Sequence, residues 1–479
     1  MKRFVLFSGV ALVVILFPQS VQAGWSRTYG SGYNDIGYCV EQTRDQGYIA
    51  CGTAVYPLSN LIKMDQTGDT LWTHIADYCY WVEQTSDGGY IVTGEALIDD
   101  GKYHIFLLKT DSLGNTLWYR EDFGGDSISD TVSGIGLSVQ ETSDGGYIIT
   151  GHKSLWVWEE IGDLWLIKTD SLGNTLWTRV YGADGPDCGC CVRQTSDGGY
   201  IISGYSESLQ SLWLLKTNEA GDTVWTQSSS GWVLGRGYCV QQTSDEGYIL
   251  TGSIAPFYDG KNHLFLLKTD STGDTLWSRI DIGWLSPAGG GVGRCIQQTP
   301  DDGYIITGYT SEWYDEIDDL WLIKTDSEGD TLWTRIYGGE AEDLGHCVDQ
   351  TADGGYIVTG ATKSFGVGGY DLWLLKTDAS GDTLDVVEEP PVTPVTHPSN
   401  WRLRASVGQQ IVLQYSDFPQ GFHAFVFDAA GRKVDELHSV SPSGTLTWGE
   451  DDGCYSPGVY FIRSSSEEPS VTQKVILIK

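Results

Sequence analysis

The chain has 479 residues, with 29 lysines and arginines against 64 aspartates and glutamates, and its formal net charge is −35. This excess of negative charge excludes the electrostatic attraction to phosphates on which nucleic-acid binding and attachment to anionic membranes depend, so we expect neither partner. The length exceeds that of one ordinary domain and suits one large repeat fold with a small second domain.

Residues 1–23 have the composition of a secretory signal peptide. Lys2 and Arg3 give a basic start, residues 4–17 form an apolar run, and residues 21–23 (VQA) offer small residues for cleavage. No later stretch reaches the apolar length that a membrane span needs. We therefore expect a protein that is exported through the periplasm and then secreted or held at the cell surface, and not an integral membrane protein.

Residues 24–384 carry one motif in seven copies, at a period of roughly fifty residues. The motif T-[SRAP]-D-x-G-Y-I begins at Thr43, Thr85, Thr142, Thr195, Thr243, Thr299 and Thr351. Each copy holds four runs of β-branched and aromatic residues bounded by Gly and Asp, which predict four short strands. Examples of the first to fourth strand are residues 237–243, 89–94, 164–169 and 331–338. The pattern predicts an all-β fold, a seven-bladed β-propeller, with the first strand of each copy innermost.

The two ends of the repeat predict how the ring closes. Six copies have a Trp in the fourth strand, whereas Asp385 stands at that position in the seventh copy. Residues 24–30 (GWSRTYG) match the missing strand, which reads LWTRIYG at residues 332–338. We therefore expect the N-terminal strand to complete the last blade, so that no blade edge stays free.

The composition changes after the last copy. Residues 385–400 are acidic and rich in Pro, which indicates an extended linker. Residues 401–479 lack the repeat, and the runs IVLQYS, FHAFVF, GVYFIR and QKVILIK predict the strands of a small β-sandwich.

Both regions resemble known bacterial families. The propeller copies resemble the SBBP β-propeller repeat, whose consensus runs roughly GNxYVTG, D-x-F-V-x-K-L-D, G-N-x-x-W and YGG. Residues 401–479 resemble the C-terminal sorting domain of the type IX secretion system and the related FlgD-like immunoglobulin-type domain, through FDAAGRKV (427–434), Trp448-Gly449, SPGVYFIR (456–463) and the terminal KVILIK. The usual YPNP of the sorting domain is replaced here by THPSNW. The second resemblance implies the outer-membrane secretion machinery as a partner.

The stretch KTDSLGNTLW occurs at residues 109–118 and again at 168–177. Asp111 can accept backbone N–H bonds and Gly114 can take a positive φ, as a turn between two strands requires. A catalytic residue is needed once or twice, whereas a turn is needed in every blade, so we interpret the stretch as a turn. Calcium would be the natural counter-ion of this acidic chain, but the two acids of a D-x-x-G-D turn are too few for a site. We therefore expect no metal site and no cofactor, with calcium left open.

Three other residue types recur along the copies. A Lys of the third strand should form structural ion pairs, and a Trp of the fourth strand should pack between blades. Five copies have a Cys four residues before the repeated Thr, where two other copies have Trp81 and Ser138, so this is a packing position. We expect thiols of different blades to lie too far apart to bond, and we leave open one bridge within CGCC at residues 188–191.

The residues that break the repeat point to a binding surface. The connections from the second to the third strand, and from each copy to the next, vary in length and sequence and share one face of the propeller. They carry the candidate ligand-binding residues Trp156, Trp158, Trp232, Tyr258, Trp284, Trp313 and Tyr314. Acids such as Glu159 and Asp315 lie beside them, and exposed aromatics beside carboxylates suit a glycan or a protein ligand. The alternative is that several of these rings pack over the blades.

These observations favour a non-enzymatic binding or scaffold protein whose ligand is a glycan or a protein. The alternative from another class is an extracellular glycoside hydrolase or polysaccharide lyase that uses two loop carboxylates. The chain contains no HExxH and no GxSxG, and its loop acids are too numerous to assign catalytic residues, which remain unknown. A third alternative is a purely structural component of the cell envelope.

Overall fold

The structure is a computed structural model, and its described elements are all β-strands. Contacts divide the chain into two units, Met1–Glu389 and Pro390–Lys479. None of the described residues forms a helix long and apolar enough to cross a membrane. The structure describes residues 24–30, 33–53, 61–74, 76–97, 103–121, 123, 133–154, 162–182, 185–207, 211–228, 233–256, 262–280, 290–310, 317–383, 401–403, 407–408, 411–416, 418, 421–428, 432–449, 458–464 and 472–477.

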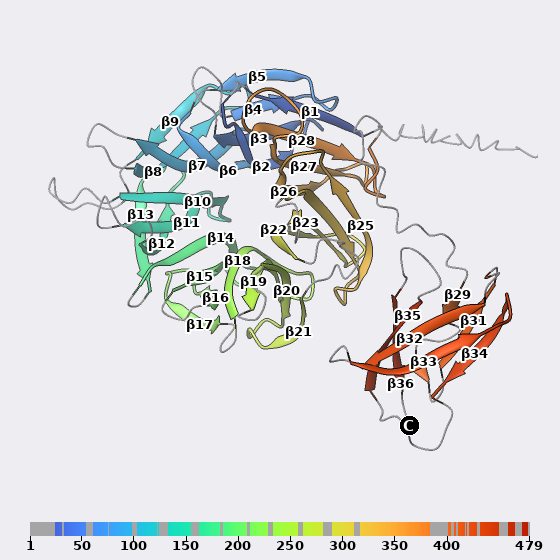
Figure 1. The fold of residues 1–479 in the computed structure, drawn as a ribbon. Helices are drawn as coiled ribbons and strands as arrows, with labels where there is room; N and C mark the ends of the chain where they lie inside the picture. The colour runs from blue at the N-terminus through green and yellow to red at the C-terminus, as the bar shows by residue number, and fades with distance from the viewer. Residues whose placement is uncertain are drawn as a thin grey trace, which may run out of the picture. The chain divides into compact units, whose positions relative to one another are not determined.

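The first unit contains seven four-stranded antiparallel sheets in a ring, which confirms the seven-bladed β-propeller (Figure 1). The innermost strands are β2 (Ile36–Gln42), β6 (Tyr78–Gln84), β10 (Ser133–Glu141), β14 (Asp187–Gln194), β18 (Val233–Gln242), β22 (Gly291–Gln298) and β26 (Asp343–Gln350). The second strands are β3 (Tyr48–Thr53), β7 (Tyr90–Leu97), β11 (Tyr147–Ser154), β15 (Tyr200–Ser206), β19 (Tyr248–Pro256), β23 (Tyr304–Thr310) and β27 (Tyr356–Thr362).

The two outer positions of each blade differ in burial. The third strands are β4 (Leu61–Met64), β8 (Tyr103–Thr110), β12 (Asp163–Thr169), β16 (Ser211–Thr217), β20 (His263–Thr269), β24 (Leu320–Thr325) and β28 (Asp371–Thr377). The outermost strands are β5 (Thr70–His74), β9 (Thr116–Arg120), β13 (Thr175–Tyr181), β17 (Thr223–Ser228), β21 (Thr275–Ile280), β25 (Thr331–Tyr337) and β1 (Trp25–Tyr29). Third strands such as β28 are buried on both faces, because neighbouring blades cover them, whereas outermost strands such as β21 are largely exposed.

A tryptophan of each outermost strand packs against a tyrosine of the next blade. The ring of Trp72, in the first blade, lies edge-on to Tyr90 of the second blade, with 5.7 Å between the ring centroids. Gly114, in a turn of the second blade, has φ 81° and lies against the same ring, so that a Cβ there would come within 2.8 Å of Trp72. Only glycine meets both demands. The described residues repeat this contact around the ring in Trp25–Tyr48, Trp72–Tyr90, Trp118–Tyr147, Trp177–Tyr200, Trp225–Tyr248, Trp277–Tyr304 and Trp333–Tyr356.

The last blade takes its outermost strand from the N-terminal end of the described chain. Its strand order is β1-β28-β27-β26, and Trp25 stands opposite Lys376 in the pairing of β1 with β28. Trp25 then packs against Tyr48 of the first blade, and the Tyr29 hydroxyl donates a hydrogen bond to the Gly68 carbonyl at 2.9 Å. Residues 24–30 therefore hold the last blade to the first.

The second unit contains two sheets around a core of its own. One sheet has the order β29-β31-β34, from β29 (Trp401–Leu403), β31 (Ile411–Tyr415) and β34 (Gly444–Trp448). The other has the order β30-β36-β35-β32-β33, from β30 (Val407–Gly408), β36 (Thr472–Leu477), β35 (Gly458–Ser464), β32 (Phe422–Asp428) and β33 (Lys433–Ser439). Buried Leu413, Tyr415 and Trp448 of the first sheet belong to the same hydrophobic cluster as Phe422, Val426 and Ile462 of the second. Two sheets around one core are the arrangement of a β-sandwich.

Candidate functional site

The repeated D-x-x-G-[ND] stretch forms a turn whose polar groups are used within the turn. The backbone N–H groups of Leu113 and Asn115 both donate to Asp111 Oδ1 at 2.9 Å, and the Asn115 side chain donates to Asp111 Oδ2 at the same distance. These bonds, first of all the one from the Asn115 side chain, lower the pKa of Asp111. The equivalent Asp170 accepts the same three bonds in the next blade. The carboxylates hold the turn, as the sequence predicts.

The repeated lysines also belong to the framework. Lys168 lies with its side chain 4% exposed, and its Nζ is 3.0 Å from Asp144 Oδ2 and 2.8 Å from the Thr169 carbonyl oxygen. Burial opposes ionisation of Asp144, but hydrogen bonds from Thr142, Gly146 and Lys168 lower its pKa to about 2. The predicted ion pairs are present in all seven blades: Lys63–Asp45, Lys109–Asp87, Lys168–Asp144, Lys216–Asp197, Lys268–Asp245, Lys324–Asp301 and Lys376–Asp353.

The loop face is the side of the propeller that carries the connections between second and third strands and between consecutive blades. The candidate ligand-binding residues of this face lie outside the described residues: Trp156, Trp158, Trp232, Tyr258, Trp284, Trp313 and Tyr314. In the last blade the connection is described, and there the Lys363 ammonium lies 4.3 Å from the centre of the Tyr370 ring. The Tyr370 hydroxyl donates to Glu342 Oε2 at 2.8 Å, and Glu342 also pairs with Lys363. An aromatic ring beside a carboxylate therefore occurs on this face.

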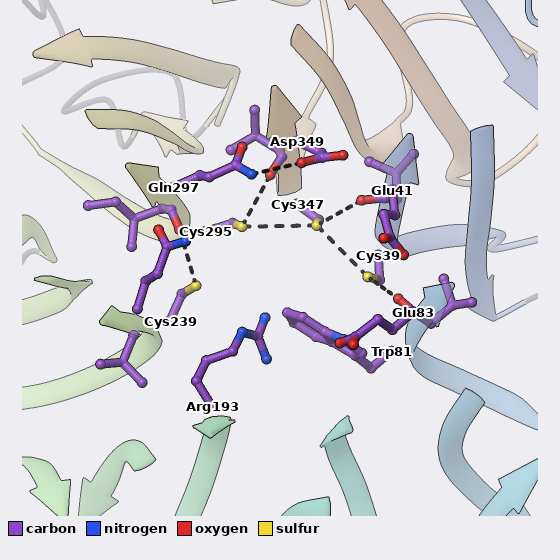
Figure 2. A pocket seen from close by; sticks show the side chains of 16 residues that line it. Cys39, Glu41, Trp81, Glu83, Arg193, Cys239, Cys295, Gln297, Cys347 and Asp349 are labelled. Atoms are coloured by element: carbon purple, nitrogen blue, oxygen red, sulfur yellow. Dashed lines mark hydrogen bonds between the residues drawn. The ribbon is translucent and has the colours of Figure 1, made fainter. Parts of the chain in front are cut away.

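The sequence did not predict the cavity that the innermost strands enclose. Its volume is about 180 Å³, and residues of six blades line it (Figure 2). Two positions of the repeat alternate along each innermost strand there. We call the residues four positions before the repeated Thr of each copy the thiol ring: Cys39, Trp81, Ser138, Cys191, Cys239, Cys295 and Cys347. We call the residues two positions before that Thr the polar ring: Glu41, Glu83, Gln140, Arg193, Gln241, Gln297 and Asp349.

The polar ring links neighbouring blades through backbone hydrogen bonds. Glu41 Oε2 accepts the N–H of Gln84 in the next blade at 2.6 Å, and Gln297 Oε1 accepts that of Gln350 at 2.7 Å. At this position, therefore, glutamate and glutamine both accept a backbone hydrogen bond from the next blade. Arg193 is the exception, because its guanidinium lies 4.5 Å from the centre of the Trp81 ring (Figure 2).

The polar ring holds three carboxyl groups whose pKa values are shifted upward. Burial is the main cause, and it raises the pKa of Glu41 to about 8 and that of Glu83 to about 7. The pKa of Asp349 is raised by burial as well. Carboxyl groups that titrate near neutral pH also occur in acid–base sites. In this cavity, however, the oxygens of Glu41 and Asp349 accept backbone N–H groups of the next blade, which gives both acids a structural role.

The prediction that thiols of different blades lie too far apart to bond is wrong. The Sγ atom of Cys347 lies 3.9 Å from that of Cys39 and 4.0 Å from that of Cys295. The physical reason is that the innermost strands converge on the axis, where equivalent side chains of neighbouring blades meet. All nine cysteines in the described part of the chain are free thiols, including those of CGCC.

Comparison with known proteins gives no family assignment. No family model and no curated protein matches the chain. Solved structures that match include a protein of unknown function from Dyadobacter fermentans, with 10% identity, a TM-score of 0.41 and coverage of 74% of this chain and 98% of that one. An ulvan lyase bound to an oligosaccharide of GlcA and Rha3S matches with 8% identity, a TM-score of 0.47 and coverage of 74% and 97%. PorZ, a type IX secretion component of Porphyromonas gingivalis, matches with 8% identity, a TM-score of 0.29 and coverage of 95% and 70%. At these identities the similarity concerns the fold alone.

Proposed function

We propose that the chain is an exported, non-enzymatic β-propeller that binds a glycan or a protein through its loop face. The observation that supports this proposal is the difference between the two faces. The turns between third and fourth strands are built alike around the ring, with Asn218 in place of the Asp in the fourth blade, and their polar groups are used internally. The loop connections differ: β15 and β16 are joined by residues 207–210, whereas β23 and β24 are joined by residues 311–319. A surface whose residues differ around the ring is suited to specific recognition.

The loop aromatics should supply most of the binding energy, because a stacked ring buries a large apolar area at low entropic cost. Trp313→Ala and Trp156→Ala should each weaken binding by about 1–3 kcal/mol and leave the melting temperature nearly unchanged. A glycan array, with a pull-down from surface extracts for protein ligands, would provide the ligand, and calorimetry would give the affinities.

Asp170→Ala is the matched control for these variants, because it removes three hydrogen bonds from a turn on the opposite face. It should lower the melting temperature by about 2 °C and leave binding intact. Loss of binding in a folded Asp170→Ala protein would contradict the proposal. Turnover of a polysaccharide by the wild-type protein would instead support the alternative of a glycoside hydrolase or lyase.

We also propose that residues 401–479 are a sorting domain that routes the propeller across the outer membrane. The support is the resemblance of FDAAGRKV and SPGVYFIR to that family, together with their placement in the structure. The two segments contribute to β32 and β35, which are paired strands in which Phe427 stands opposite Phe461. This places the two motifs side by side in one sheet.

Truncation at Pro390 tests the routing role, since it removes the second unit and keeps the propeller strands. The truncated protein should remain folded but stay in the periplasm, where fractionation and immunoblotting would detect it. A point variant that unfolds only the propeller would serve as the control for general export defects. Normal secretion of the truncated protein would rule out the routing role.

A further inference from the structure

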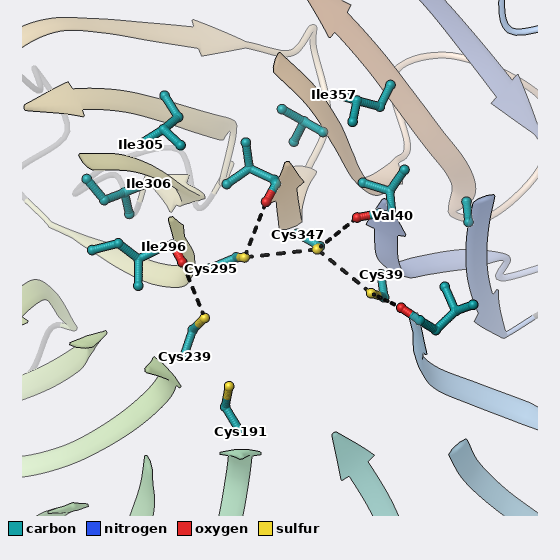
Figure 3. Close-up of a cluster of buried hydrophobic side chains, with 14 of the residues drawn as sticks. Cys39, Val40, Cys191, Cys239, Cys295, Ile296, Ile305, Ile306, Cys347 and Ile357 are labelled. Atoms are coloured by element: carbon teal, nitrogen blue, oxygen red, sulfur yellow. Dashed lines mark hydrogen bonds between the residues drawn. The ribbon is translucent and has the colours of Figure 1, made fainter. Parts of the chain in front are cut away.

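The thiol ring places five cysteines from consecutive blades around the axis (Figure 3). The distance between Cys347 Sγ and Cys39 Sγ is 3.9 Å. Each thiol also reaches across to the next blade, since Cys347 Sγ lies 3.5 Å from the Val40 carbonyl oxygen and Cys39 Sγ lies 3.4 Å from that of Val82. Neighbouring blades therefore meet at the axis through sulfur atoms in contact.

One of these contacts lies at the seam of the ring. Cys39 belongs to β2 of the first blade and Cys347 to β26 of the last blade, so the contact joins the two ends of the propeller sequence. At the outer edge this seam is held by β1, through its pairing with β28 and the packing of Trp25 on Tyr48. At the inner edge of the same seam, the contact between the Cys39 and Cys347 thiols joins the last blade to the first.

We propose that Cys39 and Cys347 form a disulfide that closes the ring at its inner edge when the protein folds in an oxidising compartment. Residues 1–23 have the composition of a signal peptide, and exported proteins meet such a compartment. Cys347 touches Cys295 as well, at 4.0 Å, but the pair with Cys39 is the closer one and the one that joins the chain ends. A disulfide has an S–S distance of about 2.05 Å, so the two sulfur atoms must approach by about 2 Å.

The oxidant is a small disulfide such as oxidised glutathione. The thiolate of one cysteine attacks the oxidant, forms a mixed disulfide and releases one glutathione thiolate. The thiolate of the second cysteine then attacks the protein sulfur of that mixed disulfide, and the second glutathione leaves. The new S–S bond replaces the S–S bond of the oxidant, which accepts two electrons, and the two protons of the cysteines end on the two glutathione thiols.

The disulfide forms while the protein folds, before the ring of blades has closed. In the closed ring Cys39 is 2% exposed and Cys347 is 5% exposed. Burial is the main cause that raises the pKa of Cys39 well above its usual value. The hydrogen bond with Cys295 lowers the pKa of Cys347, but the contact with Cys39 and burial outweigh it and hold that pKa well above the usual value too. The nucleophilic thiolates are therefore scarce there. Before the last blade docks on the first, both thiols are accessible to the oxidant.

Peptide mapping of the refolded full-length chain tests the pairing directly. The protein would be unfolded in urea with reductant, refolded in a buffer of oxidised and reduced glutathione, alkylated, and digested without reduction. Mass spectrometry should find a cross-linked peptide that contains Cys39 and Cys347 and that disappears after reduction. Alkylation of both thiols in the refolded protein, or a link from Cys347 to Cys295 in place of Cys39, would overturn the proposal.

Thermal melting gives the second test. Oxidised wild-type protein should melt about 5–10 °C above the reduced protein, because the link closes a long loop of chain. Cys347→Ser should abolish this difference. Cys79→Ser is the matched control, since Cys79 is a fully buried thiol of the second blade whose Sγ lies 3.1 Å from the Asp77 carbonyl oxygen, outside the thiol ring. The Cys79→Ser protein should therefore show the same difference between its oxidised and reduced melting temperatures as the wild type. Equal melting temperatures of oxidised and reduced wild-type protein would count against the link, and the peptide map is independent of how well either variant folds.

Discussion

Deletion of residues 24–30 should lower the melting temperature of the propeller by about 10 °C. The deletion removes Trp25, which is 5% exposed, from its contact with Tyr48, and removes the hydrogen bond from Tyr29 to Gly68. It also frees the hydrogen-bonding groups of β28 that face β1 and opens the seam between the last and first blades. Differential scanning calorimetry of the mature chain with and without these residues would measure the loss.

Arg27→Ala provides a control within the same strand. Arg27 is exposed, its Nη1 donates to the neighbouring Ser26 carbonyl at 2.9 Å, and its guanidinium lies 5.7 Å from the centre of the Trp25 ring. This variant should melt within about 1–2 °C of the wild type. If the deletion variant melted like Arg27→Ala, β1 would contribute nothing to closure.

Glu41→Gln should stabilise the protein at alkaline pH, by roughly 1–3 kcal/mol at pH 9, and have little effect near pH 4. Burial raises the pKa of Glu41 to about 8 in the folded state. The folded protein therefore keeps a proton that the unfolded chain has lost above about pH 4.5. The contribution of this group to stability is full below the unfolded pKa and is lost as the pH rises toward the folded pKa. A glutamine has no such titration, and Gln297 shows that its amide oxygen can accept the same backbone hydrogen bond.

Gln297→Glu is the reverse variant and should destabilise the protein over the same pH range. The new carboxyl group would be buried beside Asp349, to which Gln297 Nε2 now donates at 2.9 Å. Urea unfolding at pH 5, 7 and 9 would give the free energies of unfolding for both variants. Parallel pH profiles for Glu41→Gln and wild type would show that Glu41 titrates normally in the folded protein.

The sequence predicts most of the propeller because each blade repeats its own local signals. Trp72, Gly114 and Lys168 are examples of residue types that recur at fixed places, and the structure gives them the predicted packing, turn and ion-pair roles. The pairing of β1 with β28 is also present as expected, because the missing Trp of the last copy is replaced by Trp25.

The contacts that the two rings make around the axis were not predictable in the same way. The distance between Cys39 and Cys347 depends on how closely the innermost strands converge, which is a property of the closed ring and not of any local pattern. A register shift in each innermost strand, such as the one between Gly345 and Cys347, further determines which side chains reach the axis. The polar ring could have been noticed from the aligned copies, where one position changes from Glu to Gln, Arg and Asp. The loop aromatics, among them Trp156 and Trp313, lie outside the described residues, and their binding role stays a prediction.

The pairing of β1 with β28 has a mechanical consequence. The strands are antiparallel, with Trp25 opposite Lys376, and a Cβ on Gly24 would lie 2.9 Å from Thr383 Cα. The polypeptide thus enters and leaves the ring at the same end of one strand pair. Tension between the N-terminal end and the C-terminal unit would load the hydrogen bonds of this pair one after another, as in unzipping, and not all at once in shear. The propeller should therefore open first at its last blade, and at a lower force than the same strands would resist if they were pulled from opposite ends.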